Sequence, residues 1–226
     1  TQLTGFPKNS VFRICMTLHE RGYLERNEKT KQFNMTRRLL DLGSTTTGEA
    51  SLVERAWDDM VALRNQVEET VLIGVLSGDR GVVLERVFGL HPFNYNVVIG
   101  APFVLHTAAP GKAMLAFLPE RERDHVLGSL EYTKFTARTI TSRKALEKEL
   151  ARVRKTMTAF DRAEELDGCH CIAAPVFNMR SYPVASIWTT GPSNRLPQSD
   201  FGRLGKVVVD HAMRITEKLG GKPPQK

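Results

Sequence analysis

The sequence predicts an α+β protein in which a small helical module precedes a larger domain built on an antiparallel sheet. Residues 7–21 have the apolar periodicity of one short helix, and two strand-like pieces around a polar turn follow them. From residue 70 onward, strand-like and helix-like segments alternate, beginning with a hairpin. These patterns favour a winged helix-turn-helix, then a linker helix, then a sheet domain flanked by helices.

The first helix is bounded by residues with clear conformational preferences. Pro7 suits a first helical turn, where its missing N–H costs nothing, and Gly22 suits the left-handed residue that ends a helix. Apolar residues recur on one side at Val11, Ile14 or Cys15, and Leu18. The N-terminal turn of the other side carries Lys8, Asn9, Ser10 and Arg13. Such side chains can read base edges from the major groove, although a surface helix with solvated charges stays open on this pattern alone.

A basic turn follows the helix, as a winged helix requires. Residues 25–34 read as two short strands, and Arg26, Lys29 and Lys31 supply cations for DNA contacts. Residues 1–43 hold eight basic and four acidic residues, so much of the chain's net charge of +7 lies in this module. The sequence therefore predicts a partial winged helix-turn-helix DNA-binding domain over residues 1–43.

A polar breaker at residues 44–48 and a helix over 49–67 are expected to form a linker, residues 44–68. Its apolar stripe is wider than one core face needs: Leu52, Val53, Ala56, Trp57, Met60, Val61, Leu63 and Val67. The helix could pack only on its own domain, but we favour a second face for a partner subunit. A palindromic operator requires two recognition helices about 34 Å apart, which makes the protein at least a dimer.

The domain over residues 69–219 is expected to begin with a hairpin of strands 71–76 and 82–87. Helices follow at 110–118, 119–127 and 142–160, the last with Met157 and Phe160 on its apolar face. Two strands, 169–176 and 184–190, precede a final helix over 201–219 and a flexible tail, 220–226. This order predicts an antiparallel sheet flanked by helices.

Several functional classes find no support in the sequence. It contains no nucleophile elbow, metalloprotease helix, phosphate-binding loop or dinucleotide fingerprint. Three cysteines make no disulfide framework, and no 18-residue apolar window or signal peptide is present, so we expect a cytoplasmic protein without a membrane partner. Cys169 and Cys171 share one strand face while His170 points away, which makes a weak metal site. We expect no metal and no cofactor.

Three segments of the chain resemble the IclR family of bacterial transcriptional regulators. Phe6–Arg13 is similar to the family's Leu-Pro-Lys-Ser-Thr-Val-x-Arg run, Leu105–Ala116 to its His-Ala-x-Ala-x-Gly-Lys segment, and Glu164–Val176 to its Gly-x-x-Cys-Ile-Ala-Ala-Pro-Val segment. The resemblance implies a winged helix-turn-helix, a GAF-like effector-binding domain for small organic acids, and a homodimer or homotetramer on double-stranded operator DNA. It also implies that the family's first helix precedes Thr1 and is absent from this chain.

The resemblance also implies an effector pocket. Ala109 and Pro110 head a helix whose free N–H groups would face a carboxylate, and because Pro110 lacks an N–H, Gly111 or Lys112 would have to donate. Asp161, Cys171 and Thr190 match family polar positions, and Cys169 shares the face of Cys171. Trp188 departs from the family, since a small hydroxyl residue can occupy its position. With Tyr95 and Phe103 it suggests an aromatic acid, a pocket filled by the protein itself, or ordinary core.

The sequence is therefore interpreted as an effector-responsive transcriptional regulator and not as an enzyme. The alternative is a small-molecule-processing enzyme that uses Cys171 as its nucleophile, with the N-terminal segment serving assembly.

Overall fold

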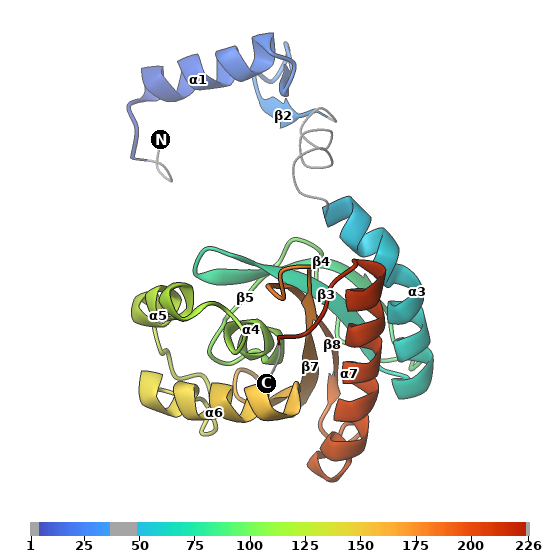
Figure 1. Cartoon of the computed structure of the whole chain (residues 1–226). Helices are drawn as coiled ribbons and strands as arrows, with labels where there is room; N and C mark the ends of the chain where they lie inside the picture. The colour runs from blue at the N-terminus through green and yellow to red at the C-terminus, as the bar shows by residue number, and fades with distance from the viewer. Residues whose placement is uncertain (1–4, 37–48, 225–226) are drawn as a thin grey trace. The chain divides into compact units, whose positions relative to one another are not determined.

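The computed structural model describes residues 5–36 and 49–224, which fall into two compact units divided near residue 52 (Figure 1). The predicted domain boundary at residue 43, the breaker at residues 44–48, and Gln225 and Lys226 lie outside the described residues.

The first unit consists of helix α1 (Lys8–Glu20) and an antiparallel hairpin of β1 (Leu24–Arg26) and β2 (Phe33–Met35). The Pro7 carbonyl accepts hydrogen bonds from the N–H groups of Ser10 and Val11, so Pro7 stands just before the first turn. Gly22 takes the left-handed conformation, φ 76°, directly after the helix. The start and stop predicted from these two residues are confirmed.

The second unit is built on a six-stranded sheet in the order β5-β4-β3-β8-β7-β6, with every neighbouring pair antiparallel. Its strands are β3 (Thr70–Ser77), β4 (Arg80–Val87), β5 (Pro102–Phe103), β6 (Ala159–Arg162), β7 (Cys169–Phe177) and β8 (Pro183–Pro192). Its helices are α3 (Glu49–Val67), α4 (Ala109–Leu115), α5 (Glu120–Ser129), α6 (Arg143–Thr156), the 3-10 turn η1 (Gln198–Asp200) and α7 (Phe201–Lys218). The predicted hairpin is β3 and β4.

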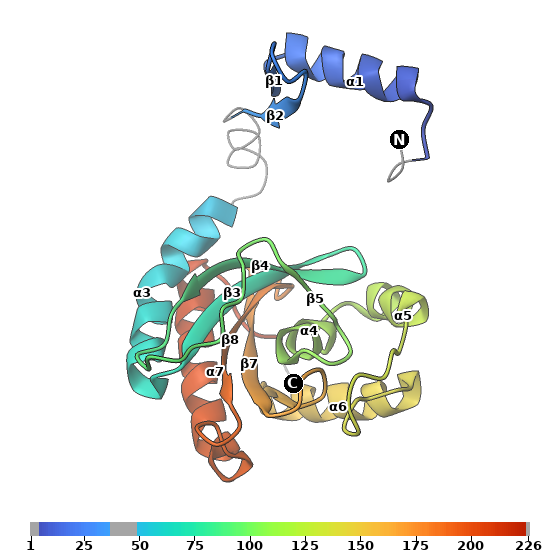
Figure 2. The same cartoon turned by 180° about the vertical axis from the view of Figure 1, so that it is seen from behind.

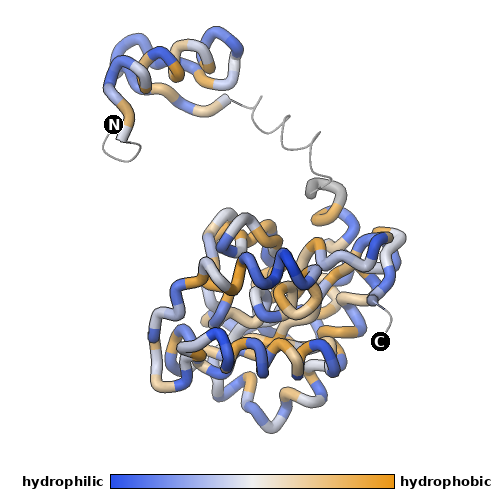
Figure 3. Tube along the Cα trace, turned by 60° about the vertical axis from the view of Figure 1, so that its left-hand side comes forward, coloured by the Kyte–Doolittle hydropathy of each residue, from blue (hydrophilic) through white to orange (hydrophobic). Residues whose placement is uncertain are grey.

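The helices cover the sheet from two sides. Helices α4, α5 and α6 lie on one face, and α3 and α7 lie side by side on the other (Figure 2). Figure 3 shows hydrophobic and hydrophilic residues interleaved along the trace, as two-sided packing of amphipathic elements requires. Within the described residues, no helix combines the length and the apolar composition needed to cross a bilayer.

The linker helix is held by its own domain more fully than the sequence suggested. Leu52, Met60 and Leu63 of its stripe are buried within the chain, and Trp57 alone among the large apolar side chains of the described part of α3 is exposed, at 45%. Asp59 of α3 pairs with His211 of α7 at 3.1 Å. Most of the wide stripe therefore needs no partner subunit to explain it.

The helix predicted over 142–160 ends earlier, at Thr156. Met157 adopts the left-handed conformation with φ 60°, and its N–H donates to the Val153 carbonyl, which closes the helix. The chain then turns back as edge strand β6, so Met157 and Phe160 do not lie on the helix. Phe160 instead stacks on Phe201, with ring centroids 4.6 Å apart. The change matters because β6 carries Asp161 to a position opposite Cys171.

Strand register brings the predicted pocket residues onto one face of the sheet. Trp188 of β8 lies opposite Leu72 of β3 and Ala173 of β7, and Thr190 lies opposite Cys171. These positions alternate with buried residues that face α3 and α7. The face that carries Trp188 and Thr190 is the one covered by α4.

Candidate functional site

Helix α1 presents its polar N-terminal turn to solvent. Lys8, Asn9, Ser10 and Arg13 are exposed, and among the described residues neither Lys8 nor Arg13 makes an ion pair. Phe12, one turn after Lys8, packs edge-to-face on Phe33 of the hairpin, with centroids 6.4 Å apart. The hairpin thus packs on α1, while the predicted base-reading residues are exposed to solvent.

The hairpin turn carries the other predicted DNA contacts. Lys29 and Lys31 are exposed, and Lys31 pairs with Glu28 at 3.0 Å across open solvent. Arg26 differs, because its guanidinium lies 5.8 Å from the centroids of both Phe12 and Phe33 and its Nε is buried. This placement gives Arg26 a packing role between helix and hairpin, which the sequence pattern did not indicate.

A cavity of about 210 Å³ lies in the second unit between the sheet and the start of α4. The predicted pocket residues that line it are Tyr95, Phe103, Pro110, Asp161, Cys169, Cys171, Trp188 and Thr190. No sequence pattern indicated the remaining lining residues, which are Val83, Val97, Pro102, Ala108, Glu165 and Leu166. Residues from five strands, one helix and three loops therefore meet at one site.

Polar groups of this cavity gather at one wall. Thr190 Oγ1 accepts a hydrogen bond from the Cys171 thiol at 3.2 Å and lies 3.5 Å from Cys169 Sγ. Asp161 accepts the Glu164 N–H at 2.7 Å, and burial raises its carboxyl pKa to about 7. Burial likewise raises the pKa of the Tyr95 phenol to about 12. At neutral pH the wall thus offers a phenol, a hydroxyl and a partly protonated carboxyl.

Aromatic rings form another part of the cavity lining. Phe103 and Trp188 meet edge-to-face, with centroids 5.4 Å apart. A Cβ added at Gly81 would fall within 2.0 Å of atoms of the Phe103 ring, so only glycine lets this ring lie against β4. Trp188 is 4% exposed and packs in the core cluster, yet space remains beside it. The site is neither filled by Trp188 nor separate from the core.

The start of α4 differs from the prediction at Lys112. Its N–H donates to the Ala108 carbonyl at 3.2 Å, and its side chain is fully buried and pairs with Glu164 at 2.7 Å. Lys112 is not part of the cavity lining, because its N–H is bonded within the helix and its ammonium lies against Glu164. Ala109 and Gly111 are buried and do not line the cavity. Gly111 packs against the Leu105 backbone, where a Cβ would lie 2.7 Å from it.

Lys112 and Glu164 form a buried ion pair. Glu164 is 3% exposed, and its second oxygen, Oε2, has no hydrogen-bond partner among the described residues. Lys112 also lowers the pKa of Asp161, although burial outweighs it. No periodicity could have indicated Glu164, because its partner lies 52 residues away in the sequence.

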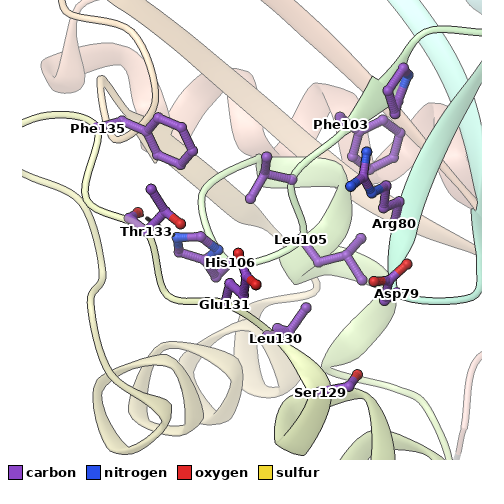
Figure 4. A pocket seen from close by; sticks show the side chains of 12 residues that line it. Asp79, Arg80, Phe103, Leu105, His106, Ser129, Leu130, Glu131, Thr133 and Phe135 are labelled. Carbon is purple, nitrogen blue, oxygen red and sulfur yellow. Dashed lines mark hydrogen bonds between the residues drawn. The ribbon is translucent and has the colours of Figure 1, made fainter. Parts of the chain in front are cut away.

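A second cavity, of about 320 Å³, lies on the other side of β5 (Figure 4). Pro102 and Phe103 line both cavities, so this strand separates them. Arg80, Asp79 and Glu131 line the second cavity, as does His106, whose Nε2 bonds the Thr133 carbonyl at 3.0 Å. Although larger, it contains only Phe103 of the predicted pocket residues, and it lacks the thiols, the phenol and Thr190.

The Cys169-His170-Cys171 run adopts the alternation expected of a strand. His170 turns away from the cavity and bonds the Leu196 carbonyl through Nδ1 at 2.7 Å. Within the described part of the chain, no group of three or more histidine, cysteine or acidic side chains is arranged to hold a metal ion. The two thiols consequently belong to the cavity wall.

Both parts of the chain match known domains. Residues 1–28 match the IclR helix-turn-helix domain, and residues 44–217 match the C-terminal domain of the bacterial transcriptional regulator IclR. The HTH-type transcriptional regulator XynR of Escherichia coli strain K12 is 27% identical over 221 residues, covering 97% of this chain and 87% of XynR.

Solved structures share the fold. The Thermotoga maritima IclR aligns with a TM-score of 0.74 at 27% identity, over 97% of this chain and 88% of that one. An IclR homolog from Microbacterium hydrocarbonoxydans, solved in complex with 4-hydroxybenzoate, aligns with a TM-score of 0.79 at 19% identity, over 95% and 87% of the two chains. With both domain matches in order along the sequence, the chain belongs to the IclR family of bacterial transcriptional regulators.

Proposed function

We propose that this regulator binds operator DNA as an oligomer and that a small organic acid, with one aromatic ring at most, binds in the cavity beside Trp188. The observation that carries the proposal is the cavity's division into an aromatic wall and a polar wall, reached from strands far apart in the sequence. Pockets of this composition hold the body of a ligand on apolar surface and fix its orientation with few polar groups.

The cavity's size sets the ligand class. A cavity of about 150 Å³ admits benzene, so the 210 Å³ here accommodates one ring or a short aliphatic acid. A relative of the same fold binds 4-hydroxybenzoate, which supports the aromatic choice. The Tyr95 and Thr190 hydroxyls can donate to a carboxylate, whereas an ionised Asp161 would repel it. Because the pKa of Asp161 is about 7, we expect carboxylate affinity to fall as pH rises from 6 to 8.

Ligand binding is tested by titrating the protein with 4-hydroxybenzoate and acetate, with the uncharged 4-hydroxybenzamide as control, while tryptophan fluorescence and thermal stability are recorded. Trp188→Phe should remove quenching at the site and leave the Trp57 signal. Thr190→Val should weaken binding by about 0.5 to 1.5 kcal/mol through one lost hydrogen bond. Arg80→Ala, in the second cavity, is the matched control and should change nothing. An effect of Arg80→Ala without one of Thr190→Val would place the ligand in the second cavity instead.

Operator recognition is proposed to depend on Arg13, which is exposed at the start of α1. Arg13→Ala should cost about 1 to 3 kcal/mol on a specific site while barely changing non-specific binding. Lys29→Ala should instead reduce the salt dependence on every sequence, because it would remove a phosphate contact. Equal losses on operator and random duplex would show that Arg13 contacts phosphate. A binding constant independent of salt would contradict DNA binding by this unit.

Oligomerisation is proposed to use Trp57, the large apolar side chain of α3 that the chain leaves 45% exposed. Sedimentation over a hundredfold concentration range should show a dimer or larger species. Trp57→Ser should shift the equilibrium toward monomer, whereas Glu54→Ser, on an exposed neighbouring position, should not. A monomer mass at all concentrations in the full-length protein would rule out the assembly.

A further inference from the structure

Two thiols of the cavity wall lie next to one another on the same face of β7. Cys169 and Cys171 are separated by one residue, both line the cavity, and neither is in a disulfide. The Cys171 thiol donates to Thr190 Oγ1 at 3.2 Å, which leaves the Thr190 hydroxyl proton available to Cys169 Sγ at 3.5 Å. A single hydroxyl thus connects the two sulfurs.

We propose that Cys169 and Cys171 form an oxidisable dithiol, which hydrogen peroxide converts to a disulfide within one strand of the cavity wall. The proposal goes beyond effector binding, because it requires only the peroxide and the two sulfurs. A peroxide molecule is far smaller than the 210 Å³ cavity that both thiols line.

The environment assigns different roles to the two sulfurs. Hydrogen bonding with Cys171, Thr190 and Tyr95 lowers the pKa of Cys169 to about 7, although burial and the Glu165 carboxylate oppose this. The hydrogen bond to Cys169, burial and the nearby Asp161 raise the pKa of Cys171 well above its ordinary value. Since the thiolate is the nucleophile, Cys169 is the sulfur that attacks peroxide.

The chemistry proceeds in two balanced steps. The Cys169 thiolate attacks one peroxide oxygen, an S–O bond forms as the O–O bond breaks, and hydroxide leaves and is protonated to water. The sulfur loses two electrons and the peroxide gains them. The Cys171 sulfur then attacks the sulfenic acid sulfur, an S–S bond forms as the S–O bond breaks, and the leaving hydroxide takes the Cys171 proton to give a second water.

Strand geometry makes such a disulfide readily reducible. Residues i and i+2 of an extended strand have their Cα and their Cβ atoms about 6.6 Å apart, whereas a disulfide holds its Cβ atoms about 3.5 to 4.5 Å apart, so the bridge requires β7 to bend locally. The bond would therefore form with strain, and strained disulfides have high reduction potentials. A bridge of this kind is suited to reversible oxidation and not to permanent stabilisation.

The sequence provides a clean assay for the pair. Both cysteines fall in one tryptic peptide, residues 163–180, while Cys15 falls in another, residues 14–21. The reduced full chain is treated with a few equivalents of hydrogen peroxide and alkylated with iodoacetamide. It is then digested with trypsin in the absence of reductant, and the peptides are analysed by mass spectrometry. Peptide 163–180 should lose about 2 Da and resist alkylation, and dithiothreitol should restore both properties. Cys15, which is partly exposed on α1, should be alkylated as before.

Serine variants separate the roles. Cys171→Ser should stop the reaction at a Cys169 sulfenic acid, which dimedone captures, and Cys169→Ser should slow oxidation of peptide 163–180 by at least about tenfold. Cys15→Ser should leave the rate unchanged. Oxidation of Cys15 as fast as the pair, or an unchanged rate in Cys169→Ser, would overturn the proposal. The mass change in the unmodified chain decides the matter even if a variant folds poorly, and neither ligand nor DNA enters the assay.

Discussion

Asp161 should make the second unit less stable at high pH than at low pH, and Asp161→Asn should remove that dependence. The carboxyl is 5% exposed, and burial raises its pKa from 3.8 to about 7. In the unfolded chain it ionises near its ordinary value, so between these two pKa values the folded state holds a proton that the unfolded state has lost. Stability must therefore fall as pH rises through this window.

The size of the effect follows from the two pKa values. The raised pKa lowers the free energy of unfolding by about 1.7 kcal/mol at pH 5 and by about 4 kcal/mol at pH 8, since each pKa unit represents about 1.4 kcal/mol. Asparagine keeps the oxygen that accepts the Glu164 N–H at 2.7 Å but carries no charge. Asp161→Asn should consequently raise the free energy of unfolding at both pH values. The increase at pH 8 should exceed the increase at pH 5 by about 2 to 3 kcal/mol.

Urea unfolding at both pH values, followed by tryptophan fluorescence, measures this difference. Both tryptophans, Trp57 and Trp188, lie in the second unit and therefore report on its unfolding. Asp167→Asn is the matched control, because Asp167 is exposed and pairs only across solvent with Arg138. Its effect should stay within about 0.5 kcal/mol at either pH. An Asp161→Asn effect that is the same at pH 5 and pH 8 would refute the reasoning.

Two further substitutions test the packing around the cavity. Lys112→Met should destabilise the second unit by about 3 to 5 kcal/mol, because it leaves Glu164 buried without its partner, and adding Glu164→Gln should restore much of that loss in the same urea assay. Gly81→Ala should displace the Phe103 ring and cost about 1 to 3 kcal/mol, and a crystal structure with the ring unmoved would contradict this.

The order of strands and helices could be predicted because most elements carry their own periodicity. The exceptions are a very short strand and a helix that ends at an unusual residue. Strand β5 has two residues, which is too few for a pattern to be recognised. The end of α6 depends on Met157 in a left-handed conformation, and sequence reasoning expects glycine there. The first two residues of β6, Ala159 and Phe160, were therefore read as helix, and the strand that carries Asp161 was not predicted.

The candidate site shows the same division between local and distant causes. Cys169, Cys171, Trp188 and Thr190 line one cavity, and their shared face could be predicted because side chains alternate along a strand. Lys112 was misplaced, since its burial depends on Glu164, a partner that only the tertiary structure reveals. Arg26 was assigned to DNA by charge, whereas two rings brought together by folding determine where its guanidinium lies.

The strand shared by the two cavities has a consequence for selectivity. Phe103 lines both spaces, with Gly81 behind its ring and Trp188 at its edge. A rotation of this side chain would change the shape of both compartments, because its ring contributes to the lining of each. Selectivity in the smaller compartment therefore depends in part on the Phe103 rotamer, and replacing Phe103 by a smaller residue would enlarge both spaces.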